Sequence, residues 1–233
     1  MPKRPSLLDF QAVLFDIDGT LVDSLFRITQ GLGDTILHYC GFRPEEPEIR
    51  QMVGLPLLKQ MAVFAKDPTM IQPMANHAME RIGVHSHGTE ERYFDATVEC
   101  LKLCHQNGIR TALVTSKNAI ERDAFMNSFS SRTYVDTVVC ASDVSEPKPS
   151  PESALLACER LQLSPSDCAF VGDSIYDMRC GKSAGTACIA VAYGAGAHDA
   201  LEAEQPDLLF TLPEQLLLWA QESLTHLSCH ARK

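Results

Sequence analysis

The chain has 233 residues, of which 45% are hydrophobic and 21% charged, and its 30 acidic and 20 basic residues give a formal net charge of −10. This length predicts one core domain with an insertion rather than two full domains. The acidic balance argues against sequence-independent binding to nucleic acid and against binding to anionic membranes. An anionic substrate must therefore be held by local groups, and a metal cation would help to hold it.

No signal peptide or membrane span is indicated. Residues 1–5 carry charge with no long apolar segment after them, and no run of 18 apolar residues occurs. Nine cysteines are scattered along the chain without a Cys-x-x-Cys pair. Cys100 and Cys104 have a spacing compatible with a metal pair, but no histidine lies in a matching register. We expect a reduced, cytoplasmic protein.

The first predicted element is a buried strand over residues 12–15. It is followed by Asp16, Asp18 and Gly19, and open α/β sheets bind their ligands beyond such strand ends. In an extended chain, residues two apart point the same way, so Asp16 and Asp18 would face one pocket. Two neighbouring carboxylates repel each other, and they therefore need a cation, a shared proton or separate roles. The alternative is that Asp18-Gly19 is only a hairpin turn.

The next segment is predicted to be a helical insertion. Ser24 provides an N-cap for a helix over residues 25–40, which Gly41 ends. Further helical stretches are predicted over residues 49–53, 57–64 and 71–82, without a convincing strand. We therefore predict an α/β core made of residues 1–22 and 95–233, and a helical cap made of residues 23–94.

After the insertion, predicted strands and helices alternate. The strands are predicted over residues 110–114, 137–140, 169–171 and 187–192, and the helices over residues 98–105, up to about 129, over 152–161, up to 184 and over 213–224. This alternation predicts a doubly wound parallel sheet, covered by helices on both faces.

Polar groups follow four of these strands, and in a parallel sheet they would share one crevice. They are Asp16 and Asp18, Thr115 and Ser116, Lys148, and Asp173 with Asp177. Hard carboxylate oxygens favour Mg²⁺, which usually also binds substrate phosphate oxygens. A lysine and a hydroxyl would neutralise the remaining phosphoryl oxygens. The set predicts phosphoryl transfer with Mg²⁺ as cofactor.

These motifs resemble the haloacid dehalogenase superfamily of aspartate-nucleophile phosphatases. The matching strings are Asp16-x-Asp18-Gly-Thr-Leu, Thr115 at the second strand end, Lys148 in Lys-Pro-x-Pro-Glu, and Gly172-Asp173-Ser-x-x-Asp177. The insertion is similar to the helical cap of the phosphoglycolate phosphatase-like branch. Two departures leave the substrate open: Phe94-Asp95-Ala96 replaces a Pro-Gly turn, and Thr115-Ser116-Lys117 replaces Thr-Asn-Lys.

The resemblance implies roles for the first two carboxylates. Asp16 would attack phosphorus and form an aspartyl-phosphate. Asp18 would protonate the leaving oxygen and then activate water. Asp16 and the backbone carbonyl of Asp18 would also be ligands of Mg²⁺.

The resemblance also implies roles for the later motifs. Thr115 and Ser116 would bind phosphoryl oxygens, and Lys148 would hold both Asp16 and the phosphoryl group. Asp173 would ligate Mg²⁺, and Asp177 would ligate it or orient Lys148. The alternatives are that Thr115, Ser174 or Asp177 only cap helices, and that Lys148 is a solvated surface residue.

In caps of this kind, the loop at Gly54 would face the active site. Arg50 or Lys59 would then meet a second anionic group of the substrate; alternatively, both lie on solvated helix faces. His85 and His87 are either a metal pair or residues of a solvated turn.

We therefore expect a Mg²⁺-dependent phosphatase acting on a small phosphomonoester such as phosphoglycolate, or on pyrophosphate. It would act as a monomer or homodimer, with a small phosphorylated metabolite as partner and neither nucleic acid nor membrane. Asp18 argues against a dehalogenase, because carbon–halogen displacement needs no acid at that position. A sugar phosphomutase and a non-catalytic binding or regulatory module are the alternatives.

Overall fold

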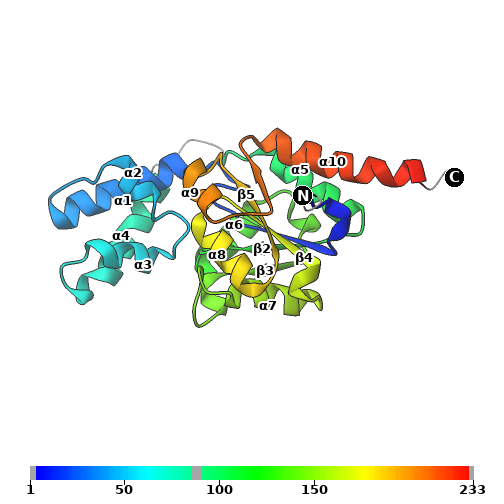
Figure 1. The fold of residues 1–233 in the computed structure, drawn as a ribbon. Helices are drawn as coiled ribbons and strands as arrows, with labels where there is room; N and C mark the ends of the chain where they lie inside the picture. Colours follow the sequence, from blue (N-terminus) through cyan, green and yellow to red (C-terminus); the bar gives the residue numbers. More distant parts are fainter. Residues whose placement is uncertain (1–3, 85–90, 231–233) are drawn as a thin grey trace.

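The protein is built on a six-stranded parallel sheet with strand order β3-β2-β1-β4-β5-β6 (Figure 1). A computed structural model describes residues 4–84 and 91–230. The strands are β1 (Ala12–Phe15), β2 (Arg110–Val114), β3 (Thr137–Val139), β4 (Cys168–Gly172), β5 (Ala187–Val191) and β6 (Leu208–Phe210). From β1 in the middle, the chain first builds one side of the sheet and then the other, so the predicted doubly wound α/β fold is confirmed.

Helices cover both faces of the sheet. Those over the sheet are α5 (Asp95–Gln106), α6 (Ala119–Ser128), α7 (Glu152–Leu161), α8 (Ile175–Ala184), α9 (His198–Ala203) and α10 (Pro213–His230). Helices α5, α6 and α10 share a hydrophobic cluster with one face, and α7 and α8 share another with the opposite face. Short 3₁₀ helices are η1 (Leu7–Asp9), η2 (Pro68–Met70), η3 (Arg132–Tyr134), η4 (Ala141–Asp143) and η5 (Pro165–Asp167).

This double cover explains why β1 is apolar along its whole length. Val13 and Phe15 pack in the cluster with α5 and α10, whereas Ala12 and Leu14 pack in the cluster with α7. Successive side chains of a strand point to opposite faces, so each face needs its own apolar set. All four residues are buried.

A separate group of helices lies beyond one edge of the sheet, at the left of Figure 1. It consists of α1 (Leu25–Cys40), α2 (Glu46–Arg50), α3 (Leu57–Phe64) and α4 (Ile71–Val84). These helices pack around their own buried cluster, which includes Leu32, Met61 and Met74. The predicted division into residues 1–22 with 95–233 and residues 23–94 stays a prediction.

The helical group joins the sheet through two neighbouring segments. The Asp23 amide donates to the Arg92 carbonyl over 2.8 Å, and the Phe94 amide donates to the Leu21 carbonyl over 2.9 Å. The two connections are thereby hydrogen-bonded to each other at the point where the chain leaves and re-enters the sheet-bearing part.

Several short or terminal elements differ from the sequence prediction. Helix α2 begins before residue 49, because Pro47 is compatible with the first turn of a helix. Helix α10 extends past residue 224 to His230. Helix α9 and strand β6 were not predicted, since six and three residues are too few to show a hydrophobic period.

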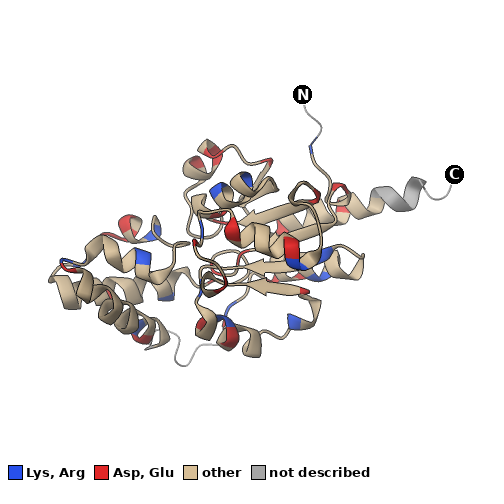
Figure 2. Cartoon of the chain, turned by 90° about the horizontal axis from the view of Figure 1, so that it is seen from below, with Lys and Arg blue, Asp and Glu red and all other residues tan. Residues whose placement is uncertain are grey.

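Charged residues are spread over both parts of the molecule in the view of Figure 2. Among the described helices, none has the length and apolar character needed to cross a bilayer. His85 and His87, for which a metal pair was considered, lie outside the described residues.

Candidate active site

The predicted site residues meet at the carboxyl edge of the sheet, beside the α1–α4 group. Asp16 follows β1, Thr115 follows β2 and Asp173 follows β4. The parallel register sets Phe15 opposite both Leu113 and Val171, so the three strands end at nearly the same level.

Lys148 lies at the centre of this edge and is only 1% exposed. Its Nζ is 2.7 Å from Asp16 Oδ1, 2.6 Å from Asp177 Oδ1 and 3.2 Å from the Val114 carbonyl oxygen. An ammonium has three donors, and these acceptors use all of them. Burial alone would lower the pKa of Lys148, but the two carboxylates raise it. The alternative of a solvated lysine is therefore wrong.

Three carboxylates form a compact cluster next to this ammonium. Oxygens of Asp16, Asp173 and Asp177 lie within 4.8 Å of one another. Burial, reinforced by Asp177 and opposed by Lys148, raises the pKa of Asp16 to about 7. Burial, together with the neighbouring Asp16 and Asp177 carboxylates, raises the pKa of Asp173 well above its usual range. One ammonium cannot balance three ionised carboxylates, and the all-oxygen donor set suits a hard divalent cation such as Mg²⁺.

Asp173 is oriented by two hydrogen bonds. The Ala195 amide donates to its Oδ2 over 2.6 Å, and the Thr20 hydroxyl donates to its Oδ1 over 3.2 Å. Gly19, at φ +83°, lies so close that a Cβ would collide with the Asp173 carboxylate. The glycine after Asp18 thus makes room for a carboxylate from another strand.

The proposed capping role of Asp177 is correct and coexists with its contact to Lys148. Its Oδ2 accepts hydrogen bonds from the backbone amide and the hydroxyl of Ser174, at 3.0 and 2.5 Å, and Ser174 in turn caps α8. Its Oδ1 remains directed at Lys148. A capping box therefore fixes the carboxylate that positions the ammonium.

Asp18 faces a different environment from Asp16. Its Oδ2 is 2.5 Å from Lys117 Nζ, and its Oδ1 is 3.9 Å from Arg27. Burial would raise the pKa of Asp18, but Lys117 and Arg27 lower it. The sequence gives no separate indication that Lys117 contacts Asp18; its position two residues after Thr115 is the available signal. The hairpin alternative is wrong, because β1 pairs in parallel with β2 and β4.

Thr115 and Ser116 lie where β2 ends. Thr115 is 1% exposed, and its Oγ1 accepts a hydrogen bond from the Lys117 amide at 3.3 Å. The next helix, α6, is capped by Asn118, so the capping alternative for Thr115 is wrong. The Ser116 hydroxyl donates to the Gly54 carbonyl over 2.5 Å, which connects the phosphoryl-binding candidates to the α1–α4 group.

Two predicted cap residues, Arg50 and Lys59, contact the core at different places, and Gly194, the partner of Arg50, packs against the Asp173 carboxylate. Arg50 donates to the Gly194 carbonyl over 3.0 Å, and Lys59 lies 3.4 Å from Glu146. Neither lines the cavity described below, whereas Gly54 does. A substrate-binding role for Arg50 stays a prediction, and its guanidinium has a different contact here.

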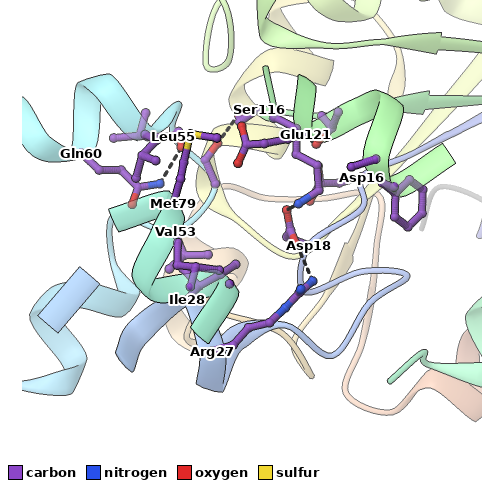
Figure 3. Close-up of a pocket in the computed structure, with 18 of the residues that line it drawn as sticks. Asp16, Asp18, Arg27, Ile28, Val53, Leu55, Gln60, Met79, Ser116 and Glu121 are labelled. Carbon is purple, nitrogen blue, oxygen red and sulfur yellow. Dashed lines mark hydrogen bonds and ion pairs between the residues drawn. The ribbon is translucent and has the colours of Figure 1, made fainter. Parts of the chain in front are cut away.

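A cavity of about 370 Å³ separates the sheet edge from the α1–α4 group (Figure 3). Asp16, Asp18 and Thr115 line it from the sheet, and Gly54, Gln60 and Met79 line it from the helices. A volume of this size accommodates a small organic ligand. The nucleophile and acid candidates thus open onto the same cavity.

Comparison with known proteins identifies the family. Residues 13–191 match the model of the haloacid dehalogenase-like hydrolases, and the chain belongs to this family. It is a phosphatase-type hydrolase, and the predicted phosphoglycolate phosphatase-like branch is confirmed.

Similar proteins include enzymes with different names. A protein named putative pyrophosphatase PpaX from Clostridium perfringens is 34% identical over 210 residues, covering 89% of this chain and 95% of its own. An N-acetylmuramic acid 6-phosphate phosphatase from Pseudomonas aeruginosa is 31% identical, covering 79% and 82%. A solved putative beta-phosphoglucomutase from Bacteroides vulgatus superposes with a TM-score of 0.79 at 22% identity, covering 94% and 91%.

Proposed function

We propose that this protein is a Mg²⁺-dependent phosphatase that hydrolyses a small phosphomonoester, such as a phosphoglycolate-like compound, or pyrophosphate. The observation that supports the proposal most is that Asp16 and Asp18, two residues apart, have different electrostatic environments. Asp16 contacts the lysine and the acidic cluster, and Asp18 contacts Lys117 at the cavity. Distinct environments suit a nucleophile and an acid–base group.

The proposed metal site consists of the side chains of Asp16, Asp173 and Asp177 with the backbone carbonyl of Asp18. The oxygen-only donor set, and the burial and repulsion from Asp16 and Asp177 that raise the pKa of Asp173, support this assignment, because a bound cation would relieve that repulsion. When bound, Mg²⁺ would supply positive charge that keeps Asp16 ionised and attracts the phosphoryl oxygens. Asp177 has the further proposed role of orienting Lys148.

In the proposed reaction, an oxygen of Asp16 forms a bond to phosphorus while the bond to the leaving oxygen breaks. Asp18 gives its proton to that leaving oxygen, and it then takes a proton from the water that hydrolyses the aspartyl-phosphate. To act as the acid, Asp18 must exchange its ion pair with Lys117 for a proton. Thr115, the Ser116 amide and Lys148 would hold the phosphoryl oxygens.

The test is phosphate release from p-nitrophenyl phosphate, with and without a chelator. Asp16→Asn should abolish release, as should the chelator, while Asp199→Asn on the exposed face of α9 should leave it unchanged. Full activity of Asp16→Asn would disprove the assignment of the nucleophile. A folded, magnesium-loaded protein without any turnover would instead favour the binding or regulatory module.

A sugar phosphomutase is the second candidate, because solved structures titled beta-phosphoglucomutase share this fold. A mutase requires priming by a sugar bisphosphate, whereas a hydrolase does not. Phosphate release from a monoester without any bisphosphate would therefore exclude it. We keep the small phosphorylated metabolite, the cytoplasmic location and the monomer or homodimer as predictions.

A further inference from the structure

We infer that, among the substrates that the proposed function covers, monoesters whose leaving group is uncharged and presents an apolar face are preferred over phosphoglycolate and pyrophosphate. This inference rests on the proposed function and narrows it. It concerns the wall of the cavity that faces Asp18, since the leaving oxygen must receive the proton of that residue.

The α1–α4 group is seated on the sheet edge, so this wall is the one that a bound leaving group meets. The loop of residues 51–54 makes two hydrogen bonds to the core: Ser116 donates to the Gly54 carbonyl over 2.5 Å, and Tyr176 donates to the Gln51 carbonyl over 2.8 Å. Arg50 adds the bond to the Gly194 carbonyl at 3.0 Å. Three contacts from one short segment hold the α1–α4 group against the sheet edge.

The wall is largely apolar. Its apolar members are Ile28, Val53, Leu55, Leu57, Met79 and Ile82, and Gln60 adds an uncharged polar side chain. Figure 3 shows Ile28, Val53 and Met79 on the opposite side of the cavity from Asp16 and Asp18. Binding is favoured when such a surface buries carbon atoms of the ligand, and it is disfavoured when the ligand brings a charge that must lose its water there.

The charged groups of the lining offer no net positive charge to a second anion. Among the described residues, the lining cations are Arg27 and Lys117, and the acids other than Asp16 are Asp18, Glu91 and Glu121. Arg27 is 2.8 Å from Glu91, and Lys117 is 2.5 Å from Asp18. Two cations therefore face three carboxylates, and an anionic leaving group would have to displace an existing partner.

The two cations predicted for a second anionic group do not line this cavity. Arg50 binds the Gly194 carbonyl and lies 3.8 Å from Glu46, and Lys59 lies 3.4 Å from Glu146. Their positions leave the apolar wall without a basic group from α2 or α3.

The test measures kcat/KM with Mg²⁺ for matched substrates. Phosphoglycolate is compared with phosphoglycolamide, which has the same size but lacks the carboxylate charge, and pyrophosphate is included. We expect the amide to be preferred by about tenfold or more. Along n-alkyl phosphates from ethyl to pentyl, kcat/KM should rise about threefold per methylene. Preference for phosphoglycolate or pyrophosphate, or no dependence on chain length, would overturn the inference.

A pair of charge insertions makes the test independent of substrate choice. Met79→Lys places a cation in the wall and should move the amide-to-carboxylate ratio toward the carboxylate by about tenfold. Leu58→Lys adds the same charge on α3 at a side chain that is 47% exposed and does not line the cavity, and it should leave the ratio unchanged. An unchanged ratio in a folded Met79→Lys protein would contradict the inference, and Ile82→Lys repeats the test if Met79→Lys does not fold. Absence of turnover with every substrate would instead disprove the proposed function.

Discussion

Lys148 Nζ lies 2.7 Å from Asp16 Oδ1, although 132 residues separate the two in the chain. The contact is buried on both sides, with side-chain exposures of 1% and 5%. Such a pair depends on its remaining partners, because each charge left alone in the interior is costly. The ammonium therefore connects the stability of this sheet edge to its proposed chemistry.

The first prediction concerns Lys148→Met. Removing the ammonium leaves Asp16 and Asp177 facing each other in the interior, so the free energy of unfolding without metal should fall by about 3–5 kcal/mol. Phosphate release should also be lost. Denaturant unfolding and a phosphate assay measure the two effects. Lys102→Met is the control, because its exposed pair with Glu99 is worth only about 0–1 kcal/mol.

The second prediction concerns Asp18→Asn. Loss of the acid–base group should lower kcat by about 10²–10⁴, and the loss should be greater for an alkyl phosphate than for an aryl phosphate, whose leaving group needs less protonation. The variant also leaves Lys117 without its carboxylate. Adding Lys117→Met should restore part of the lost stability without restoring kcat. Recovery of activity in the double variant would contradict the acid–base role.

The third prediction concerns the contact between the Gly54 loop and the core, tested with Gly54→Ala. Gly54 has φ +106°, and an added Cβ would lie 2.7 Å from the Ser174 hydroxyl. We expect a higher KM and a lower kcat/KM, because the loop can no longer sit against the core. Gly41→Ala is the matched control: its φ is +81° with nothing within 4 Å of the added Cβ. It should lose about 1–2 kcal/mol of stability and keep kcat/KM.

The fourth prediction concerns metal binding and Asp173→Asn. Mg²⁺ at about 100 times its Kd should stabilise the native protein by about 2.7 kcal/mol, visible as a rise in Tm that a chelator reverses. Asp173→Asn should lose most of that rise, whereas Asp199→Asn should keep it. Equal magnesium-induced shifts in the native protein and in Asp173→Asn would place the ion elsewhere.

The fifth prediction concerns pH and His77, far from the catalytic edge. Its Nδ1 is 2.9 Å from the Thr35 hydroxyl, and its ring stacks on that of His38 at 4.8 Å. Burial, with His38 and Arg81, lowers the pKa of His77, while Glu80 and Asp34 oppose this. The folded pKa is below the unfolded one, so stability is present above pH 6.5 and is lost as pH falls. The stability advantage of the native protein over His77→Asn should therefore shrink between pH 7.5 and 5.

The sequence predicted the sheet and most of the catalytic edge for a local reason. β1 is continuously apolar and stops at Asp16, and the polar groups of the other strands follow equally clear boundaries. The parallel arrangement then brings the strand ends together. The burial of Lys148 could not be predicted from its local sequence, because it depends on Asp16 after β1 and on Asp177 in α8.

The fine structure of the cavity was harder to predict. The position of the Arg50 guanidinium depends on how the helical group packs on the core, and the contact between Lys117 and Asp18 depends on the pairing of β1 with β2. No local sequence pattern describes either arrangement. The same limit applies to β6, since three residues at a sheet edge carry no measurable period.

The two connections between the α1–α4 group and the sheet have an evolutionary consequence. They are hydrogen-bonded to each other through Asp23 and Arg92 and through Leu21 and Phe94. Strand β1 pairs with β2 and β4, and none of the described residues between Asp23 and Arg92 belongs to the sheet. The α1–α4 group can therefore change in sequence, or be exchanged between relatives, while the residues at the carboxyl edge of the sheet stay the same. New specificities can arise by remodelling one module and leaving the other alone.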